Sequence, residues 1–426
     1  MLRSRDVTGG RWAKWFVIGL STACFSDPGS PSSGNGDDSQ SDPSTGTGTN
    51  PPTSDSTAST SSTSVTTTTT TTEESSSGES TSSPPTCEDT IAVPPEALCA
   101  RPGWSVALEG DVTGLRKAVI DGDADDLVAT FGRPDGSLAW IFGGDSPGYD
   151  TLAGVVVPTR IVVDAFDDQP GDDVILLVDG PSVPDLSAYT WAGGDYQFVG
   201  QAEPPKGEPF GAAVSALDTT PRVALLVGNT VELAPFPSLA GFEEIITPAD
   251  KTYDLARGRH GETPLLFVCK VNGFDTVPFT SGGPTIATYV LDGGGSLCAV
   301  VDVDGDGNSD FVQLRGDDRT LTTVIAGVTT TEFQEVGMAP LDASPIDIAI
   351  GDFDHDEDVD FAIIQAGLDH IRVIWTGEGA VPQVGPRLQL DDPPTALTAG
   401  DFDGDGDTDL AYALADEVRV LAIGLD

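Results

Sequence analysis

The feature that most constrains this chain is a repeat across residues 87–426, in which a turn-rich stretch leads into a short apolar run. The position just before that run recurs seven times, at intervals of 42 to 50 residues: Asp126, Asp173, Arg222, Pro264, Asp310, Asp360 and Asp409. This period is typical of propeller blades, and short apolar runs separated by turn residues predict strands. One such unit cannot bury both of its faces, but a ring of units can. We therefore predict an all-β, seven-bladed β-propeller of four-stranded antiparallel blades.

The sixth unit shows the internal order most clearly. Ile346–Ile350, Phe361–Gln365 and Ile371–Trp375 read as three successive strands, with an acidic loop after the first and a tight turn after the second. The last unit ends after its third strand, Val418–Ile423. We therefore expect Trp104–Leu108, upstream of the first full unit, to supply the missing strand and close the ring.

Three of the loops carry aspartates at alternate positions, with a further aspartate four residues later. Oxygen-only ligands in this pattern select a hard cation such as Ca²⁺. An EF-hand is excluded because it needs a glutamate at loop position twelve and flanking helices, whereas Gln313, Ile363 and Tyr412 stand there within predicted strands. Solvated acidic turns without an ion are the alternative, but carboxylates this close together would repel one another.

These stretches resemble the FG-GAP and VCBS repeats of bacterial surface proteins, which are related to the β-propeller of integrin α subunits. The resemblance is carried by Val301–Phe311 (VDVDGDGNSDF), Gly351–Phe361 (GDFDHDEDVDF) and Gly400–Leu410 (GDFDGDGDTDL). It is strong over Leu297–Asp426 and weaker over Arg101–Pro284, where the period persists but the aspartates are lost. It implies a seven-bladed propeller whose ion loops link the first two strands of a blade, all on one face.

We expect three Ca²⁺ sites, each formed by four aspartate side chains and one backbone carbonyl. The side-chain ligands are Asp302, Asp304, Asp306 and Asp310 in the fifth unit, Asp352, Asp354, Asp356 and Asp360 in the sixth, and Asp401, Asp403, Asp405 and Asp409 in the seventh. The carbonyls are those of Asn308, Asp358 and Asp407. Glycines let the fifth and seventh loops turn sharply, whereas His355 and Glu357 take those places in the sixth and leave its geometry open.

The earlier units keep only remnants of this pattern. Asp121–Asp126 is shorter and Asp164–Asp173 longer than the other loops, so ion binding there is left open, and the third unit has only Asp218 in its loop. The fourth unit carries basic residues instead, namely Arg257, Arg259 and His260. We expect it to bind no Ca²⁺ and its basic groups to neutralise neighbouring acidic loops.

The first 24 residues read as an export signal. Basic residues precede the apolar core Trp15–Leu20, which is too short to span a bilayer. Ser21-Thr-Ala-Cys24 resembles a bacterial lipobox, which implies lipidation of Cys24, although Ser21 stands where an aliphatic residue is usual. We expect an outward-facing outer-membrane lipoprotein; an ordinary cleaved signal peptide and secretion are the alternative. Residues 25–86 are rich in Ser, Thr, Pro and Gly and predict a disordered stalk.

The remaining cysteines agree with export. If Cys24 is lipidated, four are left, and an even number in an oxidising compartment favours two disulfides. Of the three possible pairings we favour Cys87–Cys99, at the domain entrance, with Cys269–Cys298, between neighbouring repeats. Buried free thiols are the alternative.

Composition limits the function. With 68 acidic and 20 basic residues and a net charge of −48, nucleic acid is an improbable partner, because phosphate binding needs clustered Lys and Arg. Gly144–Gly148 matches the nucleophile-elbow string, but no helix follows and only three histidines exist, so we assign no catalytic or cofactor-binding residue. We expect a non-catalytic, monomeric binding module for a protein or glycan. A propeller enzyme acting on polysaccharide or lipid, and a passive structural part of the envelope, are the alternatives.

Overall fold

The computed structural model describes residues 98, 100–120, 125–132, 136–144, 147–155, 158, 160–165, 171–177, 186–203, 209–217, 220–239, 241–248, 250–278, 287–377 and 379–423. The predicted export signal with Cys24, the predicted stalk, Cys87 and Cys99 lie outside these residues. The described part contains strands and turns, and none of its residues is helical. It therefore holds no helix that could cross a membrane.

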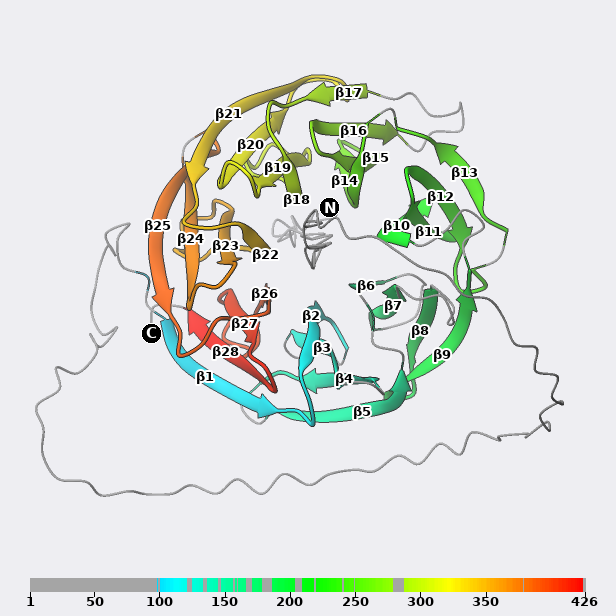
Figure 1. Ribbon diagram of the computed structural model, residues 1–426, viewed down its shortest axis with the longest axis vertical. Helices are drawn as coiled ribbons and strands as arrows, with labels where there is room; N and C mark the ends of the chain where they lie inside the picture. Colours follow the sequence, from blue (N-terminus) through cyan, green and yellow to red (C-terminus); the bar gives the residue numbers. More distant parts are fainter. Residues whose placement is uncertain are drawn as a thin grey trace, which may run out of the picture.

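The strands form seven four-stranded antiparallel sheets arranged as blades around an axis (Figure 1). Blade 1 contains β2 (Val112–Ala118), β3 (Asp126–Phe131), β4 (Gly136–Phe142) and β5 (Gly148–Val155), and blade 2 contains β6 (Arg160–Asp164), β7 (Asp173–Leu177), β8 (Leu186–Ala192) and β9 (Asp195–Ala202). Blade 3 contains β10 (Pro209–Leu217), β11 (Thr220–Val227), β12 (Thr230–Pro235) and β13 (Glu243–Ile246), and blade 4 contains β14 (Thr252–His260), β15 (Thr263–Lys270), β16 (Gly273–Pro278) and β17 (Ala287–Val290). Blade 5 contains β18 (Gly295–Val301), β19 (Asp310–Arg315), β20 (Thr320–Ala326) and β21 (Phe333–Pro340), and blade 6 contains β22 (Pro345–Gly351), β23 (Asp360–Gln365), β24 (His370–Gly377) and β25 (Val381–Gln389). Blade 7 contains β26 (Ala396–Gly400), β27 (Asp409–Ala413), β28 (Glu417–Ile423) and the N-terminal strand β1 (Ala100–Ala107).

The ring closes as predicted, through the N-terminal strand. In blades 1 to 6 consecutive strands are neighbours, with the first strand nearest the axis (Figure 1). In blade 7 the order is β1-β28-β27-β26, and β1 pairs antiparallel with β28, with Ala100 opposite Ile423 and Ala107 opposite Glu417. The closing strand starts earlier than the predicted Trp104 because residues from Ala100 also find backbone partners on β28.

The predicted starts of the second strands are correct in five blades. There the strand begins at an aspartate: Asp126, Asp173, Asp310, Asp360 or Asp409. In blades 3 and 4 it begins at Thr220 and Thr263, slightly before the predicted Arg222 and Pro264. No aspartate begins the second strand in these two blades, and the pairing of the first two strands continues to Leu217–Thr220 and His260–Thr263.

The hydrophobic core lies between adjacent blades. Alternate residues of one strand point to opposite faces, so Phe311 packs toward blade 4 while its neighbour Val312 packs toward blade 6. The ring of Phe311 stacks on that of Phe274 at a centroid distance of 4.1 Å. Every residue of β19 and of β23 is buried, because both faces of the blade are covered. These strands therefore carry adjacent apolar residues, Phe311-Val312 and Phe361–Ile364, rather than an alternating pattern, and their buried polar residues include Gln313 and Gln365.

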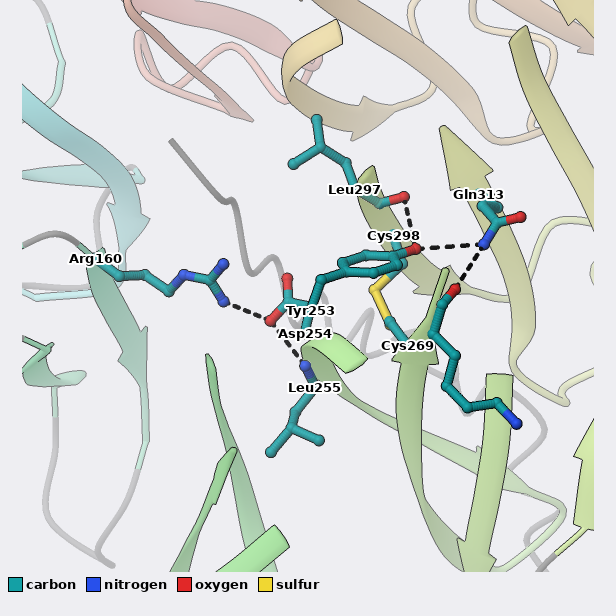
Figure 2. The surroundings of a disulfide bond; sticks show 9 residues. Arg160, Tyr253, Asp254, Leu255, Cys269, Leu297, Cys298 and Gln313 are labelled. Atoms are coloured by element: carbon teal, nitrogen blue, oxygen red, sulfur yellow. Dashed lines mark hydrogen bonds and ion pairs between the residues drawn. A yellow bond between two sulfur atoms is a disulfide. The ribbon is translucent and has the colours of Figure 1, made fainter. Parts of the chain in front are cut away.

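A disulfide joins blades 4 and 5 (Figure 2). Cys269 on β15 and Cys298 on β18 are fully buried, with their Cα atoms 6.4 Å apart. Beside them, the Tyr253 hydroxyl donates to the Leu297 carbonyl oxygen at 3.2 Å, and the Gln313 amide donates to the Lys270 carbonyl oxygen at 3.1 Å (Figure 2). The predicted Cys269–Cys298 pairing is confirmed.

Candidate metal centres

The three acidic loops lie where the resemblance places them. They connect the first to the second strand of blades 5, 6 and 7, between β18 and β19, β22 and β23, and β26 and β27. His355 in the connection of blade 6 lies 3.4 Å from Asp407 in that of blade 7, so these two connections lie on the same face of the ring. We refer to residues 302–310, 352–360 and 401–409 as loops 5, 6 and 7.

Each loop brings three carboxylates together. One oxygen from each of three aspartates lies within 4.8 Å of the other two, in the triplets Asp302, Asp304 and Asp306; Asp352, Asp354 and Asp356; and Asp401, Asp403 and Asp409. Two oxygens bound to the same Ca²⁺ at about 2.4 Å cannot be more than about 4.8 Å apart. All three triplets therefore have a spacing that a single Ca²⁺ can bridge.

The triplets leave out one predicted side-chain ligand of each loop, namely Asp310, Asp360 and Asp405. In loop 5, the Asn308 side chain donates its amide to Asp306 at 2.8 Å and accepts the Gly261 backbone N–H at 2.8 Å, and these contacts leave the predicted Asn308 carbonyl untested. Asp405, expected as a ligand in loop 7, accepts the backbone N–H of Asp407 at 2.9 Å. The Asp407 carboxylate lies 3.4 Å from His355.

The loop backbones curl around the first aspartate of each triplet. Its carboxylate accepts a backbone N–H from the residue five positions later at 2.9–3.1 Å, in the pairs Gly307–Asp302, Glu357–Asp352 and Gly406–Asp401. The aspartate at the fifth position of each loop likewise accepts the backbone N–H of the residue two positions later, at 2.7–2.9 Å, in the pairs Asn308–Asp306, Asp358–Asp356 and Asp407–Asp405. The same hydrogen-bond pattern thus forms in all three loops.

Loop 6 keeps this geometry without glycine. Gly305 and Gly307 have φ of 72° and 92°, and His355 and Glu357 at the matching places have φ of 60° and 72°. A residue with a side chain in this left-handed region costs about 1–2 kcal/mol. Loops 5 and 6 therefore turn at the same two positions. The His355 side chain connects loop 6 to Asp407 of loop 7.

The closing aspartate of each loop binds backbone. Asp310, Asp360 and Asp409 are fully buried, and each accepts two backbone N–H groups at 2.7–3.1 Å. One comes from the second residue of the loop and the other from the far end of the blade's third strand, in the sets Val303 and Ala326, Phe353 and Thr376, and Phe402 and Ile423. Burial raises the pKa of Asp310 to about 7, although the two N–H donors oppose this.

Blade 1 contains the same backbone contact without a complete loop motif. Asp126 accepts the N–H groups of Ile120 at 2.9 Å and Gly143 at 3.0 Å. The sequence predicts Asp126 as the position before a strand and as part of a degenerate ion loop, but it does not predict the two backbone contacts. The available signal is an aspartate directly before the second strand, which occurs in five of the seven blades.

The triplets fit a hard cation in one further respect. Oδ1 of Asp302 and Oδ1 of Asp354 are buried and have no hydrogen-bond partner within the described residues. A buried carboxylate oxygen without a donor is costly, and a bound cation would satisfy it. Burial, followed by the neighbouring Asp356 carboxylate, raises the pKa of Asp354 to about 6. Both effects would be relieved by positive charge.

The basic groups of blade 4 partly meet their predicted role. The Arg257 guanidinium lies 3.9 Å from Asp164, at the end of β6 in blade 2. Burial raises the pKa of Asp164 to about 6, and Arg257 opposes the rise. Arg259 and His260 instead contact blade 5: the backbone N–H of Arg259 donates to Ser309 Oγ at 2.9 Å, and His260 Nε2 lies 3.0 Å from the Gly327 carbonyl oxygen.

Two buried ion pairs connect first strands that are not neighbours. Arg116 on β2 lies 3.4 Å from Asp347 on β22, so the pair links blades 1 and 6 and bypasses blade 7. Arg160 on β6 lies 2.5 Å from Asp254 on β14, which links blades 2 and 4 (Figure 2). Sequence reasoning missed both pairs, whose partners are 231 and 94 residues apart.

Comparison with known proteins supports the fold. No known family model matches the sequence, and no curated protein matches it. Among solved structures, the chain is similar to BBS1N in crystal structures of its complex with ARL6DN, one soaked with lead and one with mercury. The first has a TM-score of 0.55 at 10% identity, covering 77% of this chain and 99% of the other; the second has a TM-score of 0.54 with the same identity and coverage. At this identity the likeness concerns the fold alone.

Proposed function

We propose that this protein is a Ca²⁺-stabilised propeller of the FG-GAP/VCBS type that serves as a non-catalytic binding module on the cell envelope. The observation that supports a bound cation is the set of carboxylate triplets, two of which contain a buried oxygen without a hydrogen-bond donor. Attachment through lipidated Cys24 and the stalk of residues 25–86 rests on the sequence pattern.

The role proposed for the ions is structural. Each triplet lies in the connection between the first two strands of its blade, and the closing aspartate ties that connection to the third strand. Ca²⁺ would neutralise carboxylates that otherwise repel and would fix the loop against the blade. The bound ions would therefore make the loops of blades 5, 6 and 7 rigid in a strongly acidic protein.

The partner is proposed to be a protein, with a glycan as the alternative. The similar BBS1N propellers are described in complex with a protein, ARL6DN, which favours protein recognition by this shape. Arg116–Asp347 and Arg160–Asp254 place buried ion pairs on the innermost strands. As the FG-GAP/VCBS resemblance implies, we place the partner on the face opposite the ion loops or at the channel mouth.

A binding experiment tests this proposal. The full chain, with and without chelation, is applied to an array of envelope glycans and to immobilised surface proteins. We expect saturable binding in the presence of Ca²⁺, and this binding should persist in a variant of one triplet aspartate as long as the propeller remains folded. Release of product from a polysaccharide or lipid panel, with no saturable binding, would contradict a non-catalytic module.

A further inference from the structure

The residue just before the closing aspartate forms a two-way hydrogen-bonded contact with the preceding blade. The Asp125 N–H donates to the Asp401 carbonyl oxygen at 2.8 Å, and the Asp401 N–H donates to Asp125 Oδ2 at 2.9 Å. Asp172 exchanges the same pair of bonds with Val119, at 2.9 and 2.8 Å. We call each such contact a clasp; it connects blade 7 to blade 1 and blade 1 to blade 2.

Blade 5 forms the same clasp with a different side chain. The Ser309 N–H donates to the Arg259 carbonyl oxygen at 2.8 Å, and the Arg259 N–H donates to Ser309 Oγ at 2.9 Å. A short oxygen-bearing side chain at this position is therefore sufficient. This gives the acidic residues retained in blades 1 and 2 a role that does not depend on ion binding.

The clasp between Asp125 and Asp401 differs because it joins the last blade to the first. Lys117 Nζ lies 3.0 Å from the same Asp125 carboxylate. Gly400 allows this approach, since a Cβ atom at that position would lie 2.7 Å from Asp125 Oδ2. Loop 7 thus contacts the seam of the ring directly.

Loop 7 also contacts the strand that closes the ring. The Phe402 carbonyl oxygen accepts the Trp104 Nε1–H at 3.3 Å from β1 and the Gly144 N–H at 2.7 Å from blade 1. Asp409 accepts the Ile423 N–H at 3.0 Å, and Ile423 pairs with Ala100 at the start of β1. β1 is the outer strand of the blade 7 sheet, where it pairs with β28.

We propose that loop 7, Asp125 and Trp104 form a latch that holds β1 in blade 7 and keeps the seam closed. Releasing the latch frees β1 before the other blades open, because β1 is the outer strand of the blade 7 sheet and is paired there with one strand, β28. The chain enters the propeller through β1, so a pull on the preceding residues acts first on this latch. One extension rests on the proposed function: a cation held by Asp401 and Asp409 tightens the latch, since both residues also form its contacts.

Hydrogen exchange of the full chain tests the latch. The variant is Asp125→Ala, with Asp172→Ala as the matched control that removes the same carboxylate from another clasp. We expect amides of β1 to exchange about fivefold faster in Asp125→Ala, as for the loss of one hydrogen bond, and to be unchanged in Asp172→Ala. Trp104→Phe is a second variant and should have the same direction of effect. Equal β1 exchange in all variants, or an equal increase in both aspartate variants, would overturn the latch.

A second arm separates the latch from the cation. Ca²⁺ is added to chelator-treated wild type, Asp403→Asn in loop 7 and Asp304→Asn in loop 5, which remove the same triplet position from the two loops. We expect Ca²⁺ to slow β1 exchange in wild type and Asp304→Asn but not in Asp403→Asn. Ca²⁺ binding that protects β1 equally in both variants overturns the coupling while leaving the proposed function intact. Absence of Ca²⁺ binding overturns the proposed function, and the Asp125 arm still decides the latch.

Discussion

Replacing Asp409 with Asn separates the two roles that this residue can have. Its carboxylate accepts the N–H groups of Phe402 and Ile423, each at 3.0 Å, and it also belongs to the loop 7 triplet. An amide presents one NH₂ group where a carboxylate had an oxygen, so one buried N–H loses its acceptor, at about 1–3 kcal/mol. Asp126→Asn is the matched control, because Asp126 makes the same two backbone contacts in blade 1.

The two variants should diverge only when Ca²⁺ is present. In chelator we expect both to lose about 1–3 kcal/mol, measured by urea unfolding followed by tryptophan fluorescence. At a free Ca²⁺ concentration about 100 times the dissociation constant, wild type gains about 2.7 kcal/mol per site by linkage, and Asp409→Asn should lose much of that gain at its site. If Ca²⁺ stabilises both variants as much as wild type, Asp409 is not a ligand. If neither variant is destabilised in chelator, the backbone role is refuted.

Three further perturbations test the fold. Replacing Cys269 and Cys298 with Ala opens a crosslink between residues 29 apart and should lower stability by about 3–4 kcal/mol; a loss below about 1 kcal/mol in urea unfolding would contradict the chain-entropy reasoning. Phe361→Ala should cost about 3–5 kcal/mol because Phe361 is fully buried between blades 5 and 6, whereas Phe198→Ala, at 54% exposure, should cost far less in the same assay. At Asp342, burial raises the pKa, but hydrogen bonds from Arg387 and Arg372 outweigh it and lower the pKa to about 2. The stabilisation from Asp342 is therefore present above its ordinary pKa of 3.8 and is lost as the pH falls through about 2; it is at most about 2 kcal/mol, less after solvent screening, so Asp342→Asn should flatten the loss of stability between about pH 4 and 2.

The blades were predictable because most second strands follow a local signal, an aspartate directly before an apolar run. In five blades the second strand begins at an aspartate. In blades 1, 5, 6 and 7 the carboxylate of this aspartate accepts one backbone N–H from the preceding loop and one from the end of the blade's third strand or the residue just after it. In blades 3 and 4 no aspartate occupies the predicted position, and strand pairing runs on by a residue or two. The closing strand was predictable from the missing fourth strand alone.

Contacts set by ring geometry were not predictable. Arg116 and Asp347 face one another only because the ring places β2 and β22 on either side of β26, the first strand of blade 7 (Figure 1). The sequence places the clasp residues Asp125 and Asp172 in degenerate ion loops. An aspartate before a strand can bind an ion or accept a hydrogen bond from the preceding blade, and the sequence alone does not distinguish these two roles. The residue type of His355 did not show whether loop 6 could turn as loop 5 does. In the structure His355 adopts the left-handed conformation, and its side chain lies 3.4 Å from Asp407 of loop 7.

Calorimetric titration of Ca²⁺ into the chelator-treated full chain tests the central claim most directly. The account predicts binding of three ions, one for each triplet, with a higher melting temperature that Mg²⁺ does not reproduce, since Mg²⁺ demands stricter octahedral geometry. Asp304→Asn, Asp354→Asn and Asp403→Asn should each abolish or weaken one site. No binding heat, with a melting temperature that chelation leaves unchanged, would contradict the assignment of all three loops.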